Sequence, residues 1–170
     1  MSNLVSGSIS FINRTVSSIR LRVLYEESMS LVEEASSYFD EEGLSLSKLL
    51  PRVSSSLYIS ESVLLTTRLM QMISWLLLQR AFEDKEMSLE QVITEKKKIQ
   101  FNVDEIDYDS PEWNDMPCFF KNLVERSLHL QNRIISLDKE IYGNNFDSFP
   151  DNINHVQTQI KLLEACFGNF

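Results

Sequence analysis

The chain has 170 residues, of which 43% are hydrophobic and 24% charged, and its formal net charge is -9 at pH 7. A chain of this length can bury roughly 70% of its unfolded surface, enough for one domain with a substantial core. The negative charge disfavours binding to nucleic acid, because affinity for phosphate comes mostly from clustered lysine and arginine. Four glycines and four prolines leave few turn residues, so a helical fold is favoured over a β-rich one.

Location in the cell is indicated by the cysteines and by the hydropathy pattern. Cys118 and Cys166 are far apart and form no C-x-x-C motif, which fits a reducing cytoplasm without disulfides or a zinc site. The most apolar stretch, Leu69 to Leu78, is ten residues long and contains two polar residues. It is too short to cross a bilayer, so we expect a cytoplasmic protein with no membrane span.

A first long helix is expected from about Ser18 to Glu42, after a flexible segment over residues 1–17. Gly43 follows it, and glycine is the residue that most often lies just beyond a helix C-terminus. Apolar and small residues at spacings of three and four predict the buried stripe of this helix. The stripe comprises Leu21, Tyr25, Ser28, Val32, Ala35 and Phe39.

A second long helix is expected from about Pro51 to Phe82, because proline is well tolerated in a first helical turn. Residues 69–78 of this helix are apolar nearly all round, whereas a helix with one solvated face carries polar residues on that side. We therefore expect coverage on several sides, either by two helices of the same chain or by one helix and a second copy of the chain. The predicted dimer or core face consists of Leu69, Met72, Ile73, Trp75 and Leu76.

The same helix carries a polar cluster ahead of its most apolar part. Glu61 and Arg68 are seven residues apart and therefore share a face, and Thr66 lies between them in the sequence. We expect Arg68 to pair with an acid on a neighbouring helix, such as Glu33 or Glu34. The cluster is interpreted either as a buried network that sets helix register or as a docking patch for a partner.

Beyond the second helix the pattern predicts a short helix, an acidic loop and a third long helix. Ser88 followed by Gln91 is a capping-box pattern, which opens the short helix. Residues 102–116 are acidic and contain a proline, so they are predicted to form a loop. The third long helix starts beyond Pro117 and ends near Gly143. Its apolar seam is interrupted only by a serine and comprises Phe120, Leu123, Ser127, Leu130, Ile134, Leu137 and Ile141.

Residues 144–170 are predicted to form a polar hinge, which contains Pro150, and an amphipathic tail. This tail is expected to bind a partner, although it could also dock on the bundle as a fourth helix. Its apolar residues at helical spacing are Val156, Ile160, Leu163 and Phe167. The predicted fold is all-α, with a bundle domain over residues 18–143 in which three long helices are joined by a short additional one.

No residue is assigned to catalysis, to a metal or to a cofactor. His129 lies four residues after Glu125, but metal sites in helical bundles use two Glu-x-x-His motifs, and the sequence has no second one. The acidic loop lacks the ligand spacing and the mid-loop glycine of a calcium-binding hand. A glycine-rich phosphate loop and a Gly-x-Ser-x-Gly elbow are also missing from the sequence. We therefore expect no enzymatic activity and no cofactor.

The run from Tyr58 to Ala81 mixes polar and apolar residues in an order that helical patterning alone does not explain. Its characteristic parts are Glu61-Ser62, Leu65-Thr66-Thr67-Arg68-Leu69-Met70-Gln71 and Trp75-Leu76-Leu77-Leu78-Gln79-Arg80. Together with Leu31-Val32-Glu33-Glu34 and Glu125-Arg126-Ser127-Leu128, this run resembles the signature of the regulator of CtrA degradation (RcdA) family of alphaproteobacteria. The resemblance extends from about residue 24 onward, whereas the start before Leu21 and the acidic loop depart from the family pattern.

The resemblance implies a small three-helix bundle, usually a homodimer, that acts as a non-catalytic adaptor. Such an adaptor helps to deliver cell-cycle regulators to the ClpXP protease. The implied partners are a ClpX-type unfoldase complex, a response-regulator-like adaptor and a protein substrate. Two other functions stay open on the sequence alone: a stand-alone helical regulator of transcription or signalling without a protease partner, and a helical-bundle enzyme with an unrecognised site.

Overall fold

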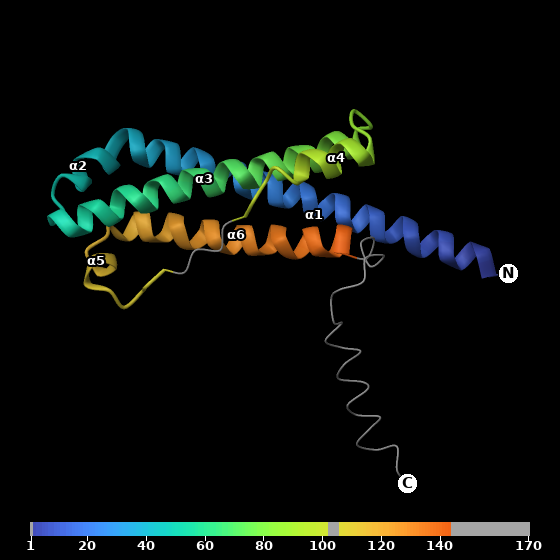
Figure 1. Cartoon of the computed structure of the whole chain (residues 1–170). Helices are drawn as coiled ribbons and strands as arrows, with labels where there is room; N and C mark the ends of the chain where they lie inside the picture. Colours follow the sequence, from blue (N-terminus) through green and yellow to red (C-terminus); the bar gives the residue numbers. More distant parts are fainter. Residues whose placement is uncertain (1, 102–105, 144–170) are drawn as a thin grey trace, which may run out of the picture. The chain divides into compact units, whose positions relative to one another are not determined.

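The computed structural model describes residues 2–101 and 106–143, and it describes side chains from residue 17 onward except at Leu44. Over these residues every regular element is a helix, which confirms the all-α prediction (Figure 1). The chain divides into two compact units, residues 1–136 and 137–170. The helix packing below is the packing within the first unit.

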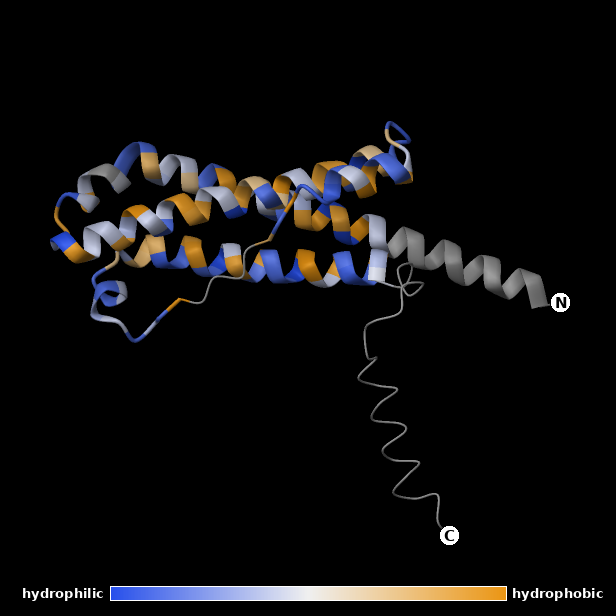
Figure 2. Cartoon of the chain, in the orientation of Figure 1, coloured by the Kyte–Doolittle hydropathy of each residue, from blue (hydrophilic) through white to orange (hydrophobic). Residues whose placement is uncertain are grey.

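Three long helices form the bundle: α1 (Ser2–Tyr38), α3 (Arg52–Glu83) and α6 (Cys118–Tyr142). Side chains join α6 to both of the others, because the rings of Tyr58 and Phe120 lie 4.6 Å apart and Arg126 donates to Glu34 at 2.9 Å. Apolar residues recur along all three helices (Figure 2). The fully buried side chains of the core include Leu31, Leu65, Met72, Trp75, Phe120, Leu123 and Ile134.

Helix α1 begins at Ser2, well before the expected start near Ser18. Its buried residues are Leu21, Leu24, Ser28, Leu31, Ala35 and Tyr38. Three members of the predicted stripe, Tyr25, Val32 and Phe39, are therefore wrong as core residues, since each remains partly exposed. Each of them directly follows a residue of similar character that is buried instead, so periodicity alone could not choose between the two rows. The observed set alternates spacings of three and four, as in a bundle seam.

Gly43 does not mark the end of the helical segment, as the sequence predicted it would. The chain continues through one π-helical turn, η1 (Phe39–Gly43), into the short helix α2 (Leu44–Ser47), and Gly43 has right-handed helical angles of φ -57 and ψ -42. A Cβ atom at Gly43 would lie 2.9 Å from the hydroxyl of Tyr58. Glycine is therefore required here by close packing and not by backbone conformation.

The connection from α3 to the short helix α4 (Leu89–Lys96) combines two helix caps. Lys85 has φ 62 and follows the last turn of α3, where Glu86 N–H donates to the carbonyl of Ala81 at 2.9 Å. This is a Schellman-type ending with lysine at the position that usually holds glycine. The predicted capping box of Ser88 and Gln91 is confirmed, with both hydrogen bonds present.

The acidic segment contains a short helix, α5 (Pro111–Asn114), where only a loop was expected. Ser110 caps it by accepting a hydrogen bond from Trp113 N–H at 3.2 Å, and proline occupies its first turn. The side chains of Trp113 and Met116 are buried, and Asp115 accepts a 2.7 Å hydrogen bond from Ser54 of α3. The pair Ser110-Pro111 is a helix start signal that was interpreted as loop punctuation.

Helix α6 agrees with its predicted seam. Six of the seven predicted positions are buried and Ile141 is partly exposed. Because α6 has one apolar face and one solvated face, its sequence pattern shows clearly which residues are buried.

Candidate partner-binding surfaces

The predicted polar cluster on α3 proves to be mostly buried. The side chain of Arg68 is 3% exposed and that of Glu61 is 8% exposed, although neither residue type is usually found in a core. Arg68 donates a 2.8 Å hydrogen bond to Ser127 of α6, and the Ser127 hydroxyl donates to the carbonyl of Val124 at 2.6 Å. The serine that interrupts the apolar seam of α6 is thus the residue that receives the arginine of α3.

Thr66 does not join this buried pair. It is exposed, and its hydroxyl donates to the carbonyl of Ser62 one turn earlier in α3, at 2.9 Å. The carboxylate of Glu34, which was one of the two acids expected near Arg68, is bound by Arg126 of α6. Which of the two arginines, Arg68 of α3 or Arg126 of α6, reaches Glu34 of α1 depends on how each helix is rotated about its axis. The sequence alone does not give these rotations.

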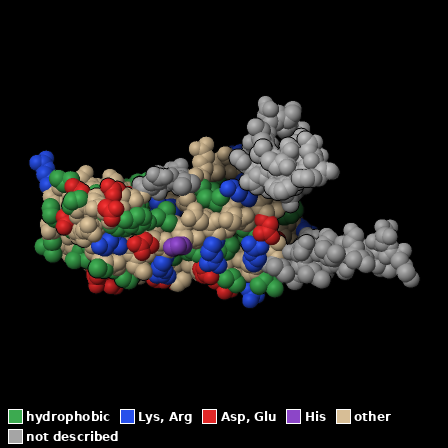
Figure 3. Space-filling view, turned by 90° about the horizontal axis from the view of Figure 1, so that it is seen from below, with side chains coloured by type: hydrophobic (Ala, Val, Ile, Leu, Met, Phe, Trp, Pro, Cys, Tyr) green, Lys and Arg blue, Asp and Glu red, His purple; other side chains and the backbone are tan. Residues whose placement is uncertain are grey.

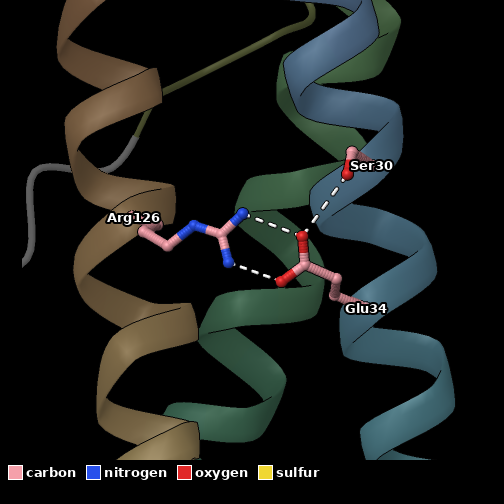
Figure 4. A network of polar contacts seen from close by, with 3 residues as sticks. All are labelled: Ser30, Glu34 and Arg126. Carbon is pink, nitrogen blue, oxygen red and sulfur yellow. Dashed lines mark hydrogen bonds and ion pairs between the residues drawn. The ribbon is translucent and has the colours of Figure 1, made fainter.

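Two arginine–glutamate pairs connect α1 to α6 along one seam. Arg126 donates from both terminal nitrogens to Glu34, which also accepts from Ser30 at 3.3 Å (Figure 4). One level further along the helices, Arg133 pairs with Glu27. The two glutamates and the two arginines are each seven residues apart, so the pairs repeat at the heptad spacing of antiparallel helices.

The seam perturbs the ionisation of its inner pair. The hydrogen bond from Arg126 lowers the pKa of Glu34, an effect that partial burial opposes, while the hydrogen bond to Glu34 raises the pKa of Arg126. Both groups are therefore held in their charged forms. The side chains remain 42% and 34% exposed, so solvent screens the attraction and the pair serves alignment more than stability.

An aromatic cluster closes the end of the bundle where α1 turns into α2. The Tyr58 hydroxyl donates a 3.3 Å hydrogen bond to the carbonyl of Gly43, and it shares a second hydrogen bond of 3.3 Å with the hydroxyl of Tyr38, in which it accepts. Burial raises the pKa of Tyr38 well above its ordinary value. The rings of Phe39 and Phe120 complete the cluster. These contacts pack α1, α3 and α6 closely against one another at this end of the bundle.

Helix α3 has one buried apolar face and a second apolar stripe on the outside. Of the predicted dimer or core face, Leu69, Met72, Trp75 and Leu76 are buried within one chain and Ile73 is partly exposed. The outer stripe consists of Ile59, Val63, Met70 and Leu77, with exposed fractions of 59%, 61%, 67% and 46%. Val63, Met70 and Leu77 are seven residues apart, so these side chains share one line along the helix.

A groove adjoins the outer stripe at the aromatic end. It has a volume of about 530 Å³, and Phe39, Tyr58, Ile59 and Val63 are among its lining residues. At the other end of α3 a second groove, of about 730 Å³, lies between α1 and α3 and has Tyr25, Leu76 and Arg80 in its lining. The guanidinium of Arg80 lies 5.8 Å from the ring centre of Tyr25. The apolar stripe and the groove beside it form a continuous surface on which a helix could pack.

Candidate metal ligands and reactive side chains can be located among the described residues. No group of three or more histidine, cysteine, aspartate or glutamate side chains within residues 2–101 and 106–143 could hold a metal ion. His129 lies exposed on α6, and Cys118 is an exposed free thiol. Among the described helices none is long and apolar enough to cross a membrane. The predicted binding tail, with Val156, Ile160, Leu163 and Phe167, lies outside the described residues.

Sequence reasoning missed the seam of arginine–glutamate pairs and the outer stripe of α3. The pairs carried a signal, because glutamates seven apart on one helix and arginines seven apart on another suit antiparallel neighbours. The stripe carried a signal as well, since residues 69–78 are apolar nearly all round. The sequence did not reveal which of these apolar residues are buried within a single chain and which stay exposed.

The chain matches a family model and is similar to solved structures. The model of a family described as a protein of unknown function, DUF1465, matches residues 12–167. The chain is also similar to the crystal structure of RcdA from Caulobacter crescentus CB15, at 38% sequence identity and a TM-score of 0.59. The similarity covers 72% of this chain and 90% of that one. No curated protein matches the sequence. The family match includes the acidic segment and begins ahead of Leu21.

Proposed function

The chain belongs to the RcdA family, and we propose that it is a non-catalytic adaptor of regulated proteolysis that helps to deliver cell-cycle regulators to the ClpXP protease. The observation that carries the proposal is the similarity to RcdA over most of both chains. The resemblance of Tyr58 to Ala81 to the family signature supports it. An adaptor needs exposed surfaces that can bind proteins, and the four exposed apolar side chains of the outer stripe of α3 support this proposal.

An adaptor of this kind accelerates degradation by tethering. Holding a client and an unfoldase on one scaffold raises their effective mutual concentration, into roughly the millimolar range for short links. Contacts that are individually weak then suffice, and no chemical step by the adaptor is needed. The rigid bundle, with its buried Arg68–Ser127 contact and its arginine–glutamate seam, would keep such surfaces in a constant arrangement.

We further propose that the chain forms a homodimer in the cytoplasm and that the outer stripe of α3 is the dimer surface. The four side chains of the stripe are exposed in the single chain, and burying them against a second copy would remove a contiguous apolar patch from water. Because Val63, Met70 and Leu77 repeat every seven residues, two copies of α3 could pack along this line as in a coiled coil.

The adaptor proposal is tested by substrate capture. A proteolytically inactive ClpP trap is assembled with its ClpX-type unfoldase in cells that contain or lack this chain, and the captured proteins are compared. We expect at least one cell-cycle regulator to be captured only in the presence of the chain, and its degradation by purified ClpXP to require the chain. Identical captured sets, together with degradation rates that do not respond to the purified chain, would contradict the proposal.

The dimer surface is tested separately by sedimentation velocity at micromolar concentration. Met70→Asp, in the middle of the outer stripe, is expected to convert a dimer into a folded monomer. Val53→Asp is the matched control, because Val53 is 64% exposed on the same helix but lies off the stripe. A wild-type monomer, or a Met70→Asp variant that sediments as the same dimer as Val53→Asp, would show that the stripe is not the dimer surface.

A further inference from the structure

A groove between α1 and α6 differs in charge from the rest of this acidic chain. It has a volume of about 440 Å³, and it shares Arg133 with the arginine–glutamate seam. Its lining residues are Ile19, Arg20, Val23, Leu24, His129, Asn132, Arg133 and Ser136. Within the part of the chain that the structure describes, no aspartate or glutamate lines it. A neighbouring groove, which shares His129 and Arg133 with this one, by contrast includes Glu26 and Glu27 in its lining.

The floor of this α1/α6 groove is apolar and accessible. Ile19 is 59% exposed and Val23 is 40% exposed, so both present apolar surface to solvent directly beside the basic rim, while Leu24 beneath them is buried. Apolar surface next to arginine favours ligands that carry an apolar group and an anionic group together, since guanidinium binds carboxylate through parallel hydrogen bonds. On the face of the molecule that carries the histidine, basic side chains lie on both sides of it, with acidic side chains among them (Figure 3).

We propose that the α1/α6 groove binds an acidic peptide segment of a partner protein, one in which an aspartate or glutamate lies close to a leucine or an aromatic residue. The carboxylate accepts hydrogen bonds from Arg133, Arg20 adds positive charge to the same rim, and the apolar side chain covers Ile19 and Val23. This proposal deepens the proposed function and rests on it, because it assigns the adaptor a second surface away from the outer stripe of α3.

Charge complementarity is the argument for this occupant. A chain with a net charge of -9 repels acidic proteins at long range, so an acidic segment binds only where basic groups are concentrated. A second copy of this chain would bring the same basic groove and the same negative charge, and it is not the occupant that the groove fits best. An acidic peptide is therefore bound because its charge complements the arginines of the groove, and not because the whole chain attracts it.

The structure provides an internal control, because Arg133 already has an acidic partner in Glu27. Arg133→Gln and Glu27→Gln both remove the same ion pair between α1 and α6. If Arg133 serves only to join the helices, the two variants change peptide binding in the same direction. If Arg133 binds a peptide carboxylate, Glu27→Gln releases it from competition and strengthens binding, whereas Arg133→Gln weakens binding.

The experiment uses the purified full-length chain and three fluorescent pools of twelve-residue peptides, rich in leucine and phenylalanine together with aspartate, with lysine or with asparagine. Fluorescence anisotropy is measured at about 0.1 M salt, where surface charges are not fully screened. We expect the aspartate pool to bind, Arg133→Gln and Val23→Asn each to weaken it about tenfold, and Glu27→Gln to strengthen it about threefold. Arg52→Gln, which removes an exposed arginine at the start of α3, leaves binding unchanged.

Four results overturn the proposal. The first is that the three peptide pools bind equally well. The second and third are that Glu27→Gln, or the control Arg52→Gln, weakens peptide binding as much as Arg133→Gln does. The fourth is that Val23→Asn converts a dimer into a monomer, which would assign the groove to a second copy of the chain. Because no protease is present, failure here is distinguishable from failure of the adaptor proposal, which the substrate trap and the degradation assay decide.

Discussion

The contact between Gly43 and Tyr58 makes a sharp prediction for the variant Gly43→Ala. An added Cβ would lie 2.9 Å from the Tyr58 hydroxyl, 3.2 Å from the carbonyl oxygen of Tyr38 and 3.3 Å from the Cδ1 atom of Phe39. Gly43 already has right-handed helical angles, so alanine requires no change of backbone region. Two effects of opposite sign therefore compete at this position.

Alanine in place of glycine stabilises a helical conformation by about 0.5–1 kcal/mol, whereas overpacking a closely packed region costs about 1–3 kcal/mol. The Tyr58 ring is 5% exposed and lies 4.6 Å from the ring of Phe120, so the hydroxyl has little room to move away. We expect steric overlap to win and the free energy of unfolding to fall by about 1–2 kcal/mol.

The assay is urea unfolding followed by circular dichroism, with Gly143→Ala as the matched control, because a Cβ there meets nothing within 4 Å. Tyr58→Phe removes the hydroxyl and is expected to cost about 1 kcal/mol through its lost hydrogen bonds. In that background Gly43→Ala should become about 1 kcal/mol less harmful than in the wild type. The reasoning is refuted if Gly43→Ala is as stable as wild type or more stable, or if its cost is the same in both backgrounds.

Two further predictions concern the helix connection and the seam. Lys85→Gly should raise the free energy of unfolding by about 1 kcal/mol, because φ 62 strains lysine but not glycine, and an unchanged or lower urea midpoint would contradict this. Glu34→Gln should lower stability near neutral pH by no more than about 1 kcal/mol, given the exposure of the pair. Since Arg126 depresses the folded-state pKa of Glu34, that contribution is present above the ordinary value of 4.5 and is lost as pH falls through the folded pKa. Wild type and variant should therefore converge in strong acid and in high salt, and a difference in unfolding free energy that is constant with pH would exclude the ion pair as its cause.

The long helices and their order follow from local patterns that act within one turn or two. The bounds of α3, the capping box of α4 and the seam of α6 were predicted because caps and apolar periodicity depend on neighbours three or four residues away. Ser127 was correctly placed in the seam of α6, yet its role was not evident until Arg68 of α3 lay against it. The position of Ser127 in the seam follows from its neighbours along α6, whereas its role depends on a residue of another helix.

The sequence by itself determined an all-α chain of three long helices, and with the family resemblance it indicated RcdA-like proteins. Only the tertiary structure decided that α1 buries Leu24 and Leu31 in place of Tyr25 and Val32, and that Glu34 pairs with Arg126. The physical reason is that the rotation of each helix is set by the joint packing of all three, and adjacent apolar residues differ by only about 100° around a helix axis. The same rotation leaves one apolar line of α3 outside the core.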